Sequence, residues 1–509
     1  MKKICLLLSL LMLASPVALM SCSDTAADGS AQGETTDTTV TDNAQTSTDE
    51  GSETVVKEDS EPTATDLIKE KYTGTDLNGF EYKVLAPGNG VDLYSAVGSV
   101  NEVYAEDTTG EPLNDALWER NSATQELLNI TIAPIWANST GDIRTQLHNE
   151  ITAGSTEYST VLNRLDYMGT SMSNGDLLNL NAISTLDTSN AWWDKNVVDS
   201  FTLFDDHRLY FISGDINFFD DYACEVLYFN KSLADDAGLA YPYSDVLEGT
   251  WTIDKFYTMA KAVEMDLNND GRIDPKDDMV GHCEVNDHIK HWLYAMGEKC
   301  VEIGENGDLT PAISNERHVN VIDTLFDYMV NKSMTYTASA DMFMSGNILF
   351  LGEMLGAIGT YRDMEHEFGV LPMPKLDEQQ QSYGEYVSNG WTTAYGIPMT
   401  NAADAETIGT ILEVLCGLST DTLRSALYDV LFAAKFVRDT ESVQMLDVIF
   451  SSKAYDWATD FTWGSGFSSL YNGLYSSGTN TFVSNVASSS KSITKILETT
   501  FTRIKDLEY

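Results

Sequence analysis

The chain has 509 residues, and its 30 Lys and Arg against 78 Asp and Glu give a formal net charge of −48. This balance excludes ordinary nucleic-acid binding, which needs basic side chains to neutralise phosphates, and it argues against attraction to anionic membrane surfaces. A hydrophobic fraction of 43% is enough for a substantial core. The length indicates about two to four domains of about 100–200 residues each.

The N-terminus has the layout of a secretory signal. Met1–Lys3 supply a basic start, and an apolar run follows over Ile4–Leu13. The run is too short for a permanent membrane span, so we predict a signal peptide over residues 1–21. Residues 19–22, Leu-Met-Ser-Cys, resemble the lipobox of bacterial lipoproteins. The resemblance implies that Cys22 is acylated and anchors the protein at the extracytoplasmic face of the cell membrane, with an ordinary signal peptide as the alternative.

A polar segment follows the signal. Residues 22–73 consist mostly of Ser, Thr, Asp, Glu, Gly and Ala. Such a composition has too little apolar surface to offset the entropy of ordering. We therefore predict a disordered tether with a root-mean-square span of about 40 Å.

Four cysteines remain in the body of the chain: Cys224, Cys283, Cys300 and Cys416. Four are too few for a disulfide scaffold in a body of this length. No C-x-x-C or Cys/His cluster indicates a zinc or redox site. A disulfide between Cys283 and Cys300 stays open, but buried free thiols are the favoured state.

Strands and helices alternate in the first part of the body. The apolar patterns predict, in order, a strand, a helix, a strand, a helix and a strand over Phe80–Ala86, Leu113–Leu128, Ile130–Ile135, Asp142–Ile151 and Tyr158–Leu162. This order is typical of an α/β domain with a largely parallel sheet. Two further strands are predicted at Leu209–Ser213 and Glu225–Asn230.

The rest of the chain repeats this alternation with more helix. Thr252 is a plausible N-cap for a helix over Ile253–Met265, and a second helix is expected from Asn315 to Val330. Strands are predicted at Ile348–Leu351, Gly356–Ile358, Phe368–Leu371 and Thr393–Pro398, and helices at Ala403–Leu418, Thr420–Phe432, Glu441–Ser451 and Ile493–Ile504. The pattern indicates two α/β lobes, each built from non-contiguous pieces.

The most specific local motif is an acidic loop at residues 266–277. It fits D-x-[DN]-x-[DN]-G, with Gly271 at the sharp turn and a hydrophobic residue at position 8. Ca²⁺ takes six to eight oxygen ligands, and alternate residues of such a loop point oxygens inward. We predict a structural calcium site; the alternative is a solvated acidic loop. The expected ligands are Asp266, Asn268, Asp270, the backbone carbonyl of Arg272, and Asp277.

No P-loop, Rossmann fingerprint, H-E-x-x-H or G-x-S-x-G motif occurs, so the sequence carries none of these nucleotide-binding or catalytic signatures. Several aromatic residues fall in predicted loops or at element ends. Aromatic rings stack on the apolar C–H faces of sugars, whereas the alternative for each ring is core packing. These residues are Trp192, Trp193, Tyr222, Tyr361, Trp391, Tyr395, Trp457 and Trp463.

At this point the chain resembles the family 1, carbohydrate-type solute-binding proteins of bacterial ABC importers. The resemblance covers about residues 78–460 and depends on motifs whose order and spacing match together. They are Tyr104–Asp107, Leu113–Asn121, Leu209–Asp215, Leu227–Lys231, Trp251–Asp254 leading into the acidic loop, and Phe368–Pro374. The family implies a type II, periplasmic-binding-protein-like α/β fold, in which two hinged lobes close on a ligand in the cleft between them.

By this resemblance, lobe 1 comprises residues 74–222 and 347–400, and lobe 2 comprises residues 223–346 and 401–509. The implied first crossing between lobes lies near Tyr222–Phe229, with a return near Asn347–Thr360 and another crossing near Pro398. The implied cleft residues are Arg164, Asp166, Asp215, Tyr222, Tyr361, Arg362, Trp391, Trp457 and Trp463. No motif identifies the sugar.

The implied function is capture of a carbohydrate, with an oligosaccharide expected, and its delivery to the permease subunits of an ABC transporter by a monomeric, lipid-anchored protein. Two other classes stay open. A peptide- or pheromone-binding lipoprotein would have a cleft rich in groups that pair with backbone and charged ends. A cell-surface glycan hydrolase would need two carboxylates about 5–9.5 Å apart across the cleft.

Overall fold

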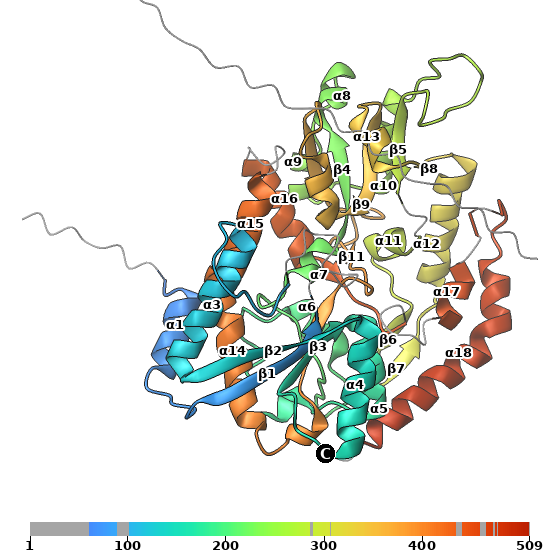
Figure 1. Cartoon of the computed structure of the whole chain (residues 1–509). Helices are drawn as coiled ribbons and strands as arrows, with labels where there is room; N and C mark the ends of the chain where they lie inside the picture. Colours follow the sequence, from blue (N-terminus) through green and yellow to red (C-terminus); the bar gives the residue numbers. More distant parts are fainter. Residues whose placement is uncertain are drawn as a thin grey trace, which may run out of the picture. The chain divides into compact units, whose positions relative to one another are not determined.

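The structure is a computed structural model that describes residues 61–88, 101–285, 289–305, 307–433, 440–458, 465–471, 474–475 and 477–507 (Figure 1). By its contacts the chain divides into a unit of residues 1–60 and a unit of residues 61–509, and the second unit contains all the described residues. The predicted signal peptide, Cys22 and most of the predicted tether lie outside the described residues. No helix among the described residues is long and apolar enough to cross a membrane.

The ordered body begins with helix α1 (Ala64–Tyr72), inside the segment predicted to be disordered. Thr63 caps the helix in a capping box with Asp66, and the side chain of Ile68 is fully buried. The helix packs on α14 (Ala405–Asp421), where the Thr65 amide donates to Asp421 Oδ2 at 2.8 Å. The prediction of disorder was therefore wrong for residues 64–72, because two apolar side chains and a cap are enough for a short helix that docks on a neighbour.

The first sheet has the strand order β12-β3-β1-β2. Strand β1 (Phe80–Pro87) pairs parallel with both β2 (Ile130–Ala137) and β3 (Thr160–Arg164), and β12 (Thr393–Gly396) adds antiparallel to β3. The connections are helices α3 (Pro112–Leu128) and α4 (Thr140–Ala153), and α5 (Leu165–Asn174) follows β3. The predicted strand–helix alternation and parallel pairing are confirmed here.

The second sheet has the strand order β10-β4-β9-β5-β8. Its strands are β4 (Glu225–Asn230), β5 (Val280–Glu284), β8 (Tyr336–Thr337), β9 (Ile348–Met354) and β10 (Phe368–Leu371). Strand β4 runs antiparallel to both neighbours, whereas β9, β5 and β8 are parallel. Every residue of β4 is buried, which fits its unbroken apolar run.

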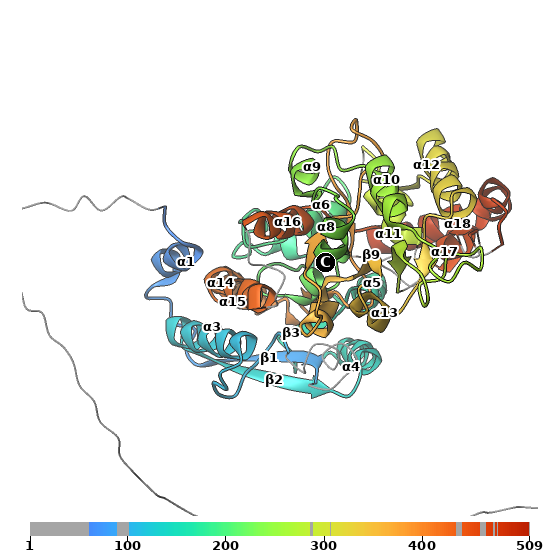
Figure 2. The same ribbon diagram turned by 90° about the horizontal axis from the view of Figure 1, so that it is seen from above.

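The division into lobes differs from the predicted boundaries. Strands β9 and β10 belong to the second sheet, so the chain returns to the first sheet only between Leu371 and Thr393. Helices α14 and α15 (Leu423–Ala433) pack against α3, beside the first sheet, as Figure 2 also shows. Helix α16 (Thr440–Ser451) packs against β10. Residues 347–371 and 401–433 were thus assigned to the wrong lobes, because strand patterns do not reveal the partner strand.

Two predicted strands also take another form. Residues 356–358 lie in a 3-10 helix, η3 (Leu355–Tyr361), because the pairing of β9 with β4 ends at Met354. Residues 209–213 form a single isolated bridge, which joins Ile212 to Tyr395. The four cysteines of the body are free and buried, so the favoured thiol state is confirmed.

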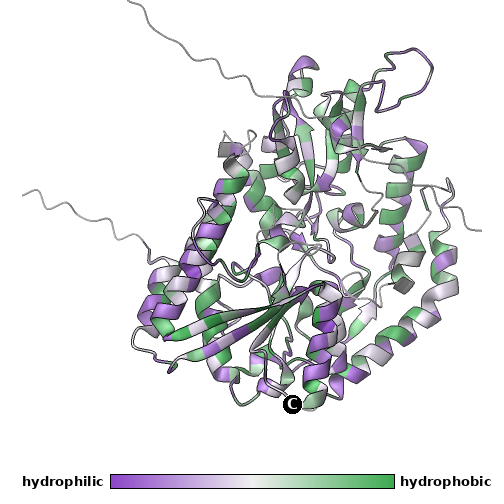
Figure 3. Cartoon of the chain, in the orientation of Figure 1, coloured by the Kyte–Doolittle hydropathy of each residue, from purple (hydrophilic) through white to green (hydrophobic). Residues whose placement is uncertain are grey.

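The remaining elements are short apart from the C-terminal helix. They are η1 (Leu180–Ala182), α6 (Lys195–Phe201), α7 (Phe219–Tyr222), α8 (Lys231–Asp236), α9 (Tyr243–Leu247), α10 (Ile253–Val263), α11 (Ile289–Ala295), β6 (Val301–Ile303), β7 (Leu309–Pro311), α12 (Glu316–Phe326), η2 (Asp327–Asn331), α13 (Ala340–Met344), β11 (Glu385–Tyr386), η4 (Met399–Asn401), β13 (Lys453–Ala454), α17 (Ser465–Tyr471) and α18 (Phe482–Lys505). In Figure 3 the strands are mostly hydrophobic, whereas helices such as α3 combine hydrophobic and hydrophilic residues. The core therefore lies along the sheets, where the helices cover them.

Candidate functional site

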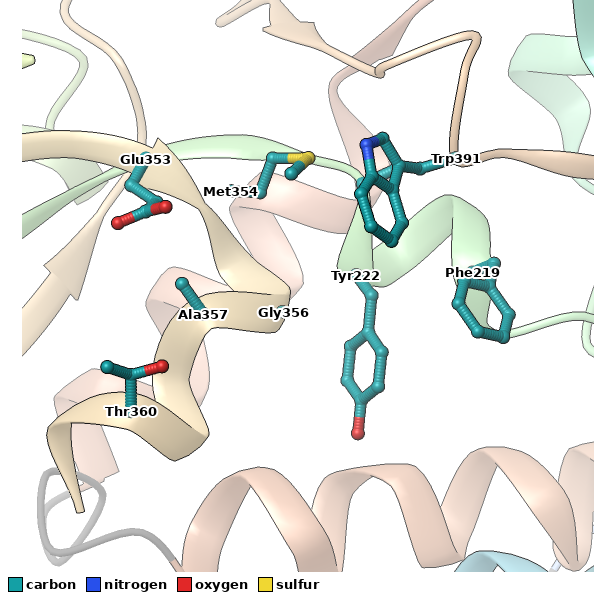
Figure 4. Close-up of a pocket in the computed structure, with 9 residues that line it drawn as sticks. Phe219, Tyr222, Glu353, Met354, Gly356, Ala357, Thr360 and Trp391 are labelled. Carbon is teal, nitrogen blue, oxygen red and sulfur yellow. The ribbon is translucent and has the colours of Figure 1, made fainter. Parts of the chain in front are cut away.

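A pocket of about 260 Å³ lies where segments of the two sheets meet. Helix α7, the end of β9, the start of η3 and the loop before β12 supply its walls. Figure 4 shows Glu353 and Ala357 on one side, and Trp391, Tyr222 and Phe219 on the other. The lining residues are Phe219, Tyr222, Ala223, Glu353, Met354, Gly356, Ala357, Thr360 and Trp391. Three aromatic rings, one carboxylate and the hydroxyls of Tyr222 and Thr360 thus surround one cavity.

The buried carboxylate of Glu102 anchors the N-terminal end of helix α7. Glu102 Oε1 accepts hydrogen bonds from the amides of Phe218 and Phe219 at 2.7 and 3.0 Å. Glu102 Oε2 accepts one from Thr393 Oγ1 in β12. Burial raises the pKa of Glu102, which is fully enclosed, while these three donors lower it. Glu102 therefore fixes α7 against the first sheet and so positions the rings of Phe219 and Tyr222 at the pocket.

The start of η3, which forms the pocket wall opposite α7, approaches this helix closely because residue 356 is a glycine. A Cβ atom on Gly356 would lie 3.2 Å from both the Cβ and the backbone oxygen of Tyr222. The Leu355 amide donates to the Cys224 carbonyl at 2.8 Å, which fixes the start of η3 beside the chain that leaves α7. On the third wall, Ser388 connects the loop of Trp391 to the same segment, because its amide donates to the Ala223 carbonyl at 3.0 Å.

Glu353 is positioned by a buried tyrosine. Tyr361 Oη donates to Glu353 Oε2 at 2.6 Å, and the ring of Tyr361 packs between Tyr228, Phe343 and Phe368. Burial raises the pKa of Glu353, the Tyr361 hydrogen bond lowers it, and the charge of Glu225 raises it further. Tyr361, which was predicted as a cleft residue, thus lies behind the pocket wall and positions Glu353.

Two of the predicted ligand residues, Tyr222 and Trp391, line the pocket. Arg164 and Asp166 form a two-pronged ion pair, with Nε–Oδ1 and Nη2–Oδ2 distances of 3.1 and 2.7 Å. The guanidinium lies beside the loop of Trp391, since a Cβ on Gly390 would be 3.5 Å from Arg164 Nη2.

The other predicted residues lie elsewhere. Arg362 is exposed at the end of η3. Trp457 is 2% exposed, and its indole N–H donates to the Ser200 carbonyl at 2.7 Å, so its ring belongs to the core. Trp463 lies outside the described residues. Asp215 lines a second cavity, where it accepts hydrogen bonds from Thr420 Oγ1 at 2.6 Å and Arg424 Nη1 at 2.8 Å.

The second cavity has a volume of about 360 Å³ and centres on a buried ion cluster. Lys453 Nζ lies 2.9, 2.6 and 2.9 Å from carboxylate oxygens of Asp194, Asp220 and Asp221. Burial raises the pKa of Asp220 to about 7, although Lys453 opposes this shift. Phe219 and Tyr222 are three residues apart in α7, and Asp220 and Asp221 lie between them, so one face of this helix meets the pocket and another meets the ion cluster.

The sequence signals for several of these residues were weak. Glu353 is one of 78 acidic residues, and Phe-Asp-Asp-Tyr at 219–222 matches none of the motifs identified in the sequence. The partner of these aspartates, Lys453, is more than 200 positions away. Only the tertiary contacts identify them.

The acidic loop follows α10 and is closed by its own hydrogen bonds. Asp266 accepts from the amides of Asp270 and Gly271, and Gly271 has a φ of +83°. Asp278, which is buried, accepts from the amides of Leu267 and Asp274, whereas Asp277 is exposed. Within the described part of the chain, no three His, Cys, Asp or Glu side chains are grouped so that they could hold a metal ion.

No protein-family model matches the chain, and no curated protein sequence matches it. Among solved structures, the cyclic α-maltosyl-1,6-maltose binding protein from Arthrobacter globiformis is similar with a TM-score of 0.55 and 11% identity, over 83% of this chain and 100% of that chain. UspC from M. tuberculosis is similar with a TM-score of 0.54 and 12% identity, over 81% of this chain and 100% of that chain. The expected fold is confirmed: the chain shares the two-lobed, periplasmic-binding-protein-like α/β fold of these two structures.

Proposed function

We propose that this protein is the lipid-anchored, extracytoplasmic substrate-binding component of an ABC importer, and that it captures a carbohydrate in the pocket of Tyr222, Glu353 and Trp391. The single observation that carries this proposal is the composition of the pocket. Three aromatic rings offer flat apolar surfaces, and Glu353 and Thr360 offer polar partners. A sugar ring needs both, because its C–H faces stack on aromatics and its hydroxyls require hydrogen bonds.

The location of the pocket supports a capture role. Its walls come from α7, from β9 and η3, and from the loop before β12, so a ligand there touches segments of both sheets. A molecule that contacts both lobes stabilises their closed arrangement over the open one. Closure of this kind is the state that a permease partner would recognise.

The pocket favours a glycan over the two alternative classes. Among the residues that the structure describes, the lining holds one carboxylate, and a hydrolase would need a second one across the cavity. The same described lining holds no basic side chain that could pair with the terminal carboxylate of a peptide. We therefore propose binding without hydrolysis.

The direct test is thermal unfolding of the mature chain, which begins at Cys22, with a panel of oligosaccharides and short peptides. A ligand at 100 times its Kd stabilises the protein by about 2.7 kcal/mol. We expect a stabilising shift with one class of glycan and no release of reducing ends during incubation. Stabilisation by peptides alone would contradict the carbohydrate proposal, and release of reducing ends would contradict the non-enzymatic one.

The lipid anchor and the permease are further parts of the proposal. The supporting feature for the anchor is the Leu-Met-Ser-Cys sequence at 19–22. We expect metabolic labelling with a fatty acid to mark the wild-type protein and not the Cys22→Ala variant, and we expect the ligand-loaded monomer to stimulate ATP hydrolysis by its permease complex.

We also propose that the loop at 266–277 binds Ca²⁺ through the five predicted ligands. Its support is the sequence pattern, together with the sharp turn at Gly271. Binding requires the carboxylates of Asp266 and Asp270 to exchange their amide partners for the ion. We expect a chelator to lower the Tm and Asp270→Ala to abolish the effect of the chelator; an unchanged Tm would leave the loop as a solvated acidic turn.

A further inference from the structure

The described lining of the pocket carries one charged side chain. Glu353 is the one carboxylate among the described lining residues, which include no basic side chain, and its hydrogen-bond donor is a tyrosine hydroxyl. Glu225, on the strand next to β9, raises the pKa of Glu353, but Glu225 Oε1 itself lies 3.2 Å from His291 Nε2. Burial raises the pKa of Tyr222, and the charges of Glu111 and Asp221 raise it further. The negative charge of the described lining is therefore that of Glu353.

Two basic groups near the pocket are held by other carboxylates. Arg164, whose guanidinium lies beside Gly390 and thus near Trp391, is held by both oxygens of Asp166. Lys453 lies on the other side of α7, within the cluster of three aspartates. Neither side chain lines the pocket.

Aromatic faces and an uncompensated carboxylate together form a cation site. The face of an aromatic ring carries negative charge density and attracts ammonium groups, and the attraction grows when the group is removed from water. A carboxylate adds a charge-assisted hydrogen bond, which is about twice as strong as a neutral one. In Figure 4 the carboxylate of Glu353 lies across the cavity from the rings of Trp391 and Tyr222. An ammonium group between them would meet both.

We infer that the pocket selects a sugar unit that carries a free amino group, and that Glu353 is the residue that determines this specificity. The inference rests on the proposed function, because it names the class of glycan for the same site. A neutral sugar would leave the charge of Glu353 without a counterion, and a uronic acid would place a second negative charge beside it. An amino sugar neutralises the site.

The test compares three β-1,4-linked oligosaccharides that differ in one substituent: glucosamine oligomers, N-acetylglucosamine oligomers and glucose oligomers. Binding to the mature chain is measured by calorimetry at about pH 6, where most of the amines are protonated, and galacturonic acid oligomers serve as the anionic arm. We expect the amine-bearing oligomer to bind at least about tenfold more tightly than its acetylated counterpart.

The variants separate specificity from folding. Glu353→Gln keeps the shape of the side chain and an oxygen that accepts from the Tyr361 hydroxyl, but it removes the charge. The preference for the amine should therefore vanish while the neutral oligomer still binds. Glu353→Asp should retain part of the preference. Glu365→Gln, an exposed position on the same segment, removes an equal charge outside the pocket and should change nothing.

Each outcome is decisive. If a neutral oligomer binds as tightly as the amine, or if Glu353→Gln keeps the preference, the inference is wrong and the carbohydrate proposal stands. If no glycan of a wider panel binds while a peptide does, the proposed function fails first and the inference fails with it. Because burial raises the pKa of Glu353, acidification below the pH of the assay should protonate its carboxylate and weaken amine binding while the amines stay protonated.

Discussion

Replacement of Lys453 by Met tests the role of the buried ion cluster. Lys453 is 8% exposed and contacts Asp194, Asp220 and Asp221 within 3 Å. Removal of one partner from a buried ion pair costs about 3–5 kcal/mol, because the opposite charges are left buried without compensation. At an unfolding entropy of about 2.1 cal/mol/K per residue, this cost lowers the Tm of the ordered unit by about 3–5 °C.

The assay is thermal unfolding of Lys453→Met and wild type between about pH 5 and 8. The destabilisation should be largest at high pH and should shrink as the pH falls, because protonation neutralises the orphaned aspartates. Lys195→Met is the matched control, since Lys195 is exposed and pairs with Asp199 at the surface; its Tm should stay at the wild-type value.

The same substitution should also affect ligand binding. Asp220 and Asp221 belong to α7, whose Phe219 and Tyr222 line the pocket, so loss of the cluster should loosen these two rings. We expect weaker glycan binding even at temperatures where Lys453→Met is folded. A variant with the wild-type Tm and an unchanged pH profile would refute the role of the cluster, and unchanged affinity would refute its link to α7.

Three further predictions concern the pocket and the cluster. Trp391→Ala should weaken glycan binding, measured by calorimetry, about tenfold or more, because it removes a stacking surface from the pocket. The control Trp118→Ala, in α3, should leave the affinity unchanged. Equal losses of affinity in the two variants would argue against stacking on Trp391. Gly356→Ala should displace Tyr222, because the added Cβ would lie 3.2 Å from it, and should therefore lower affinity; wild-type affinity would show that α7 can move freely. Because the pKa of Asp220 is raised to about 7, its stabilisation of the folded state is fully present below its ordinary pKa and is lost as the pH rises to about 7. Asp220→Asn should therefore reduce the fall in Tm between those two pH values. An unchanged fall would show that other groups cause it.

The fold class followed from the sequence because it depends on local patterns. Apolar residues at strand and helix spacing predicted β1, α3, β2, α4 and β3, and the structure places each of them within a few residues of the prediction. The N-cap predicted at Thr252 before α10 is an equally local signal. The order of elements then indicated an α/β architecture with a largely parallel first sheet.

The lobe boundaries and most of the pocket were decided by the tertiary structure. A strand pattern identifies β9 as a strand, but its pairing with β4 and β5 depends on contacts between residues that are about 70 to 130 positions apart. Tyr222 and Trp391 were predicted for the ligand site, and both line the pocket. Glu353 and Lys453 could not be predicted, because their roles come from burial and from distant partners. Local sequence fixes how a segment folds, whereas the environment of a charge exists only once the distant segments have packed around it.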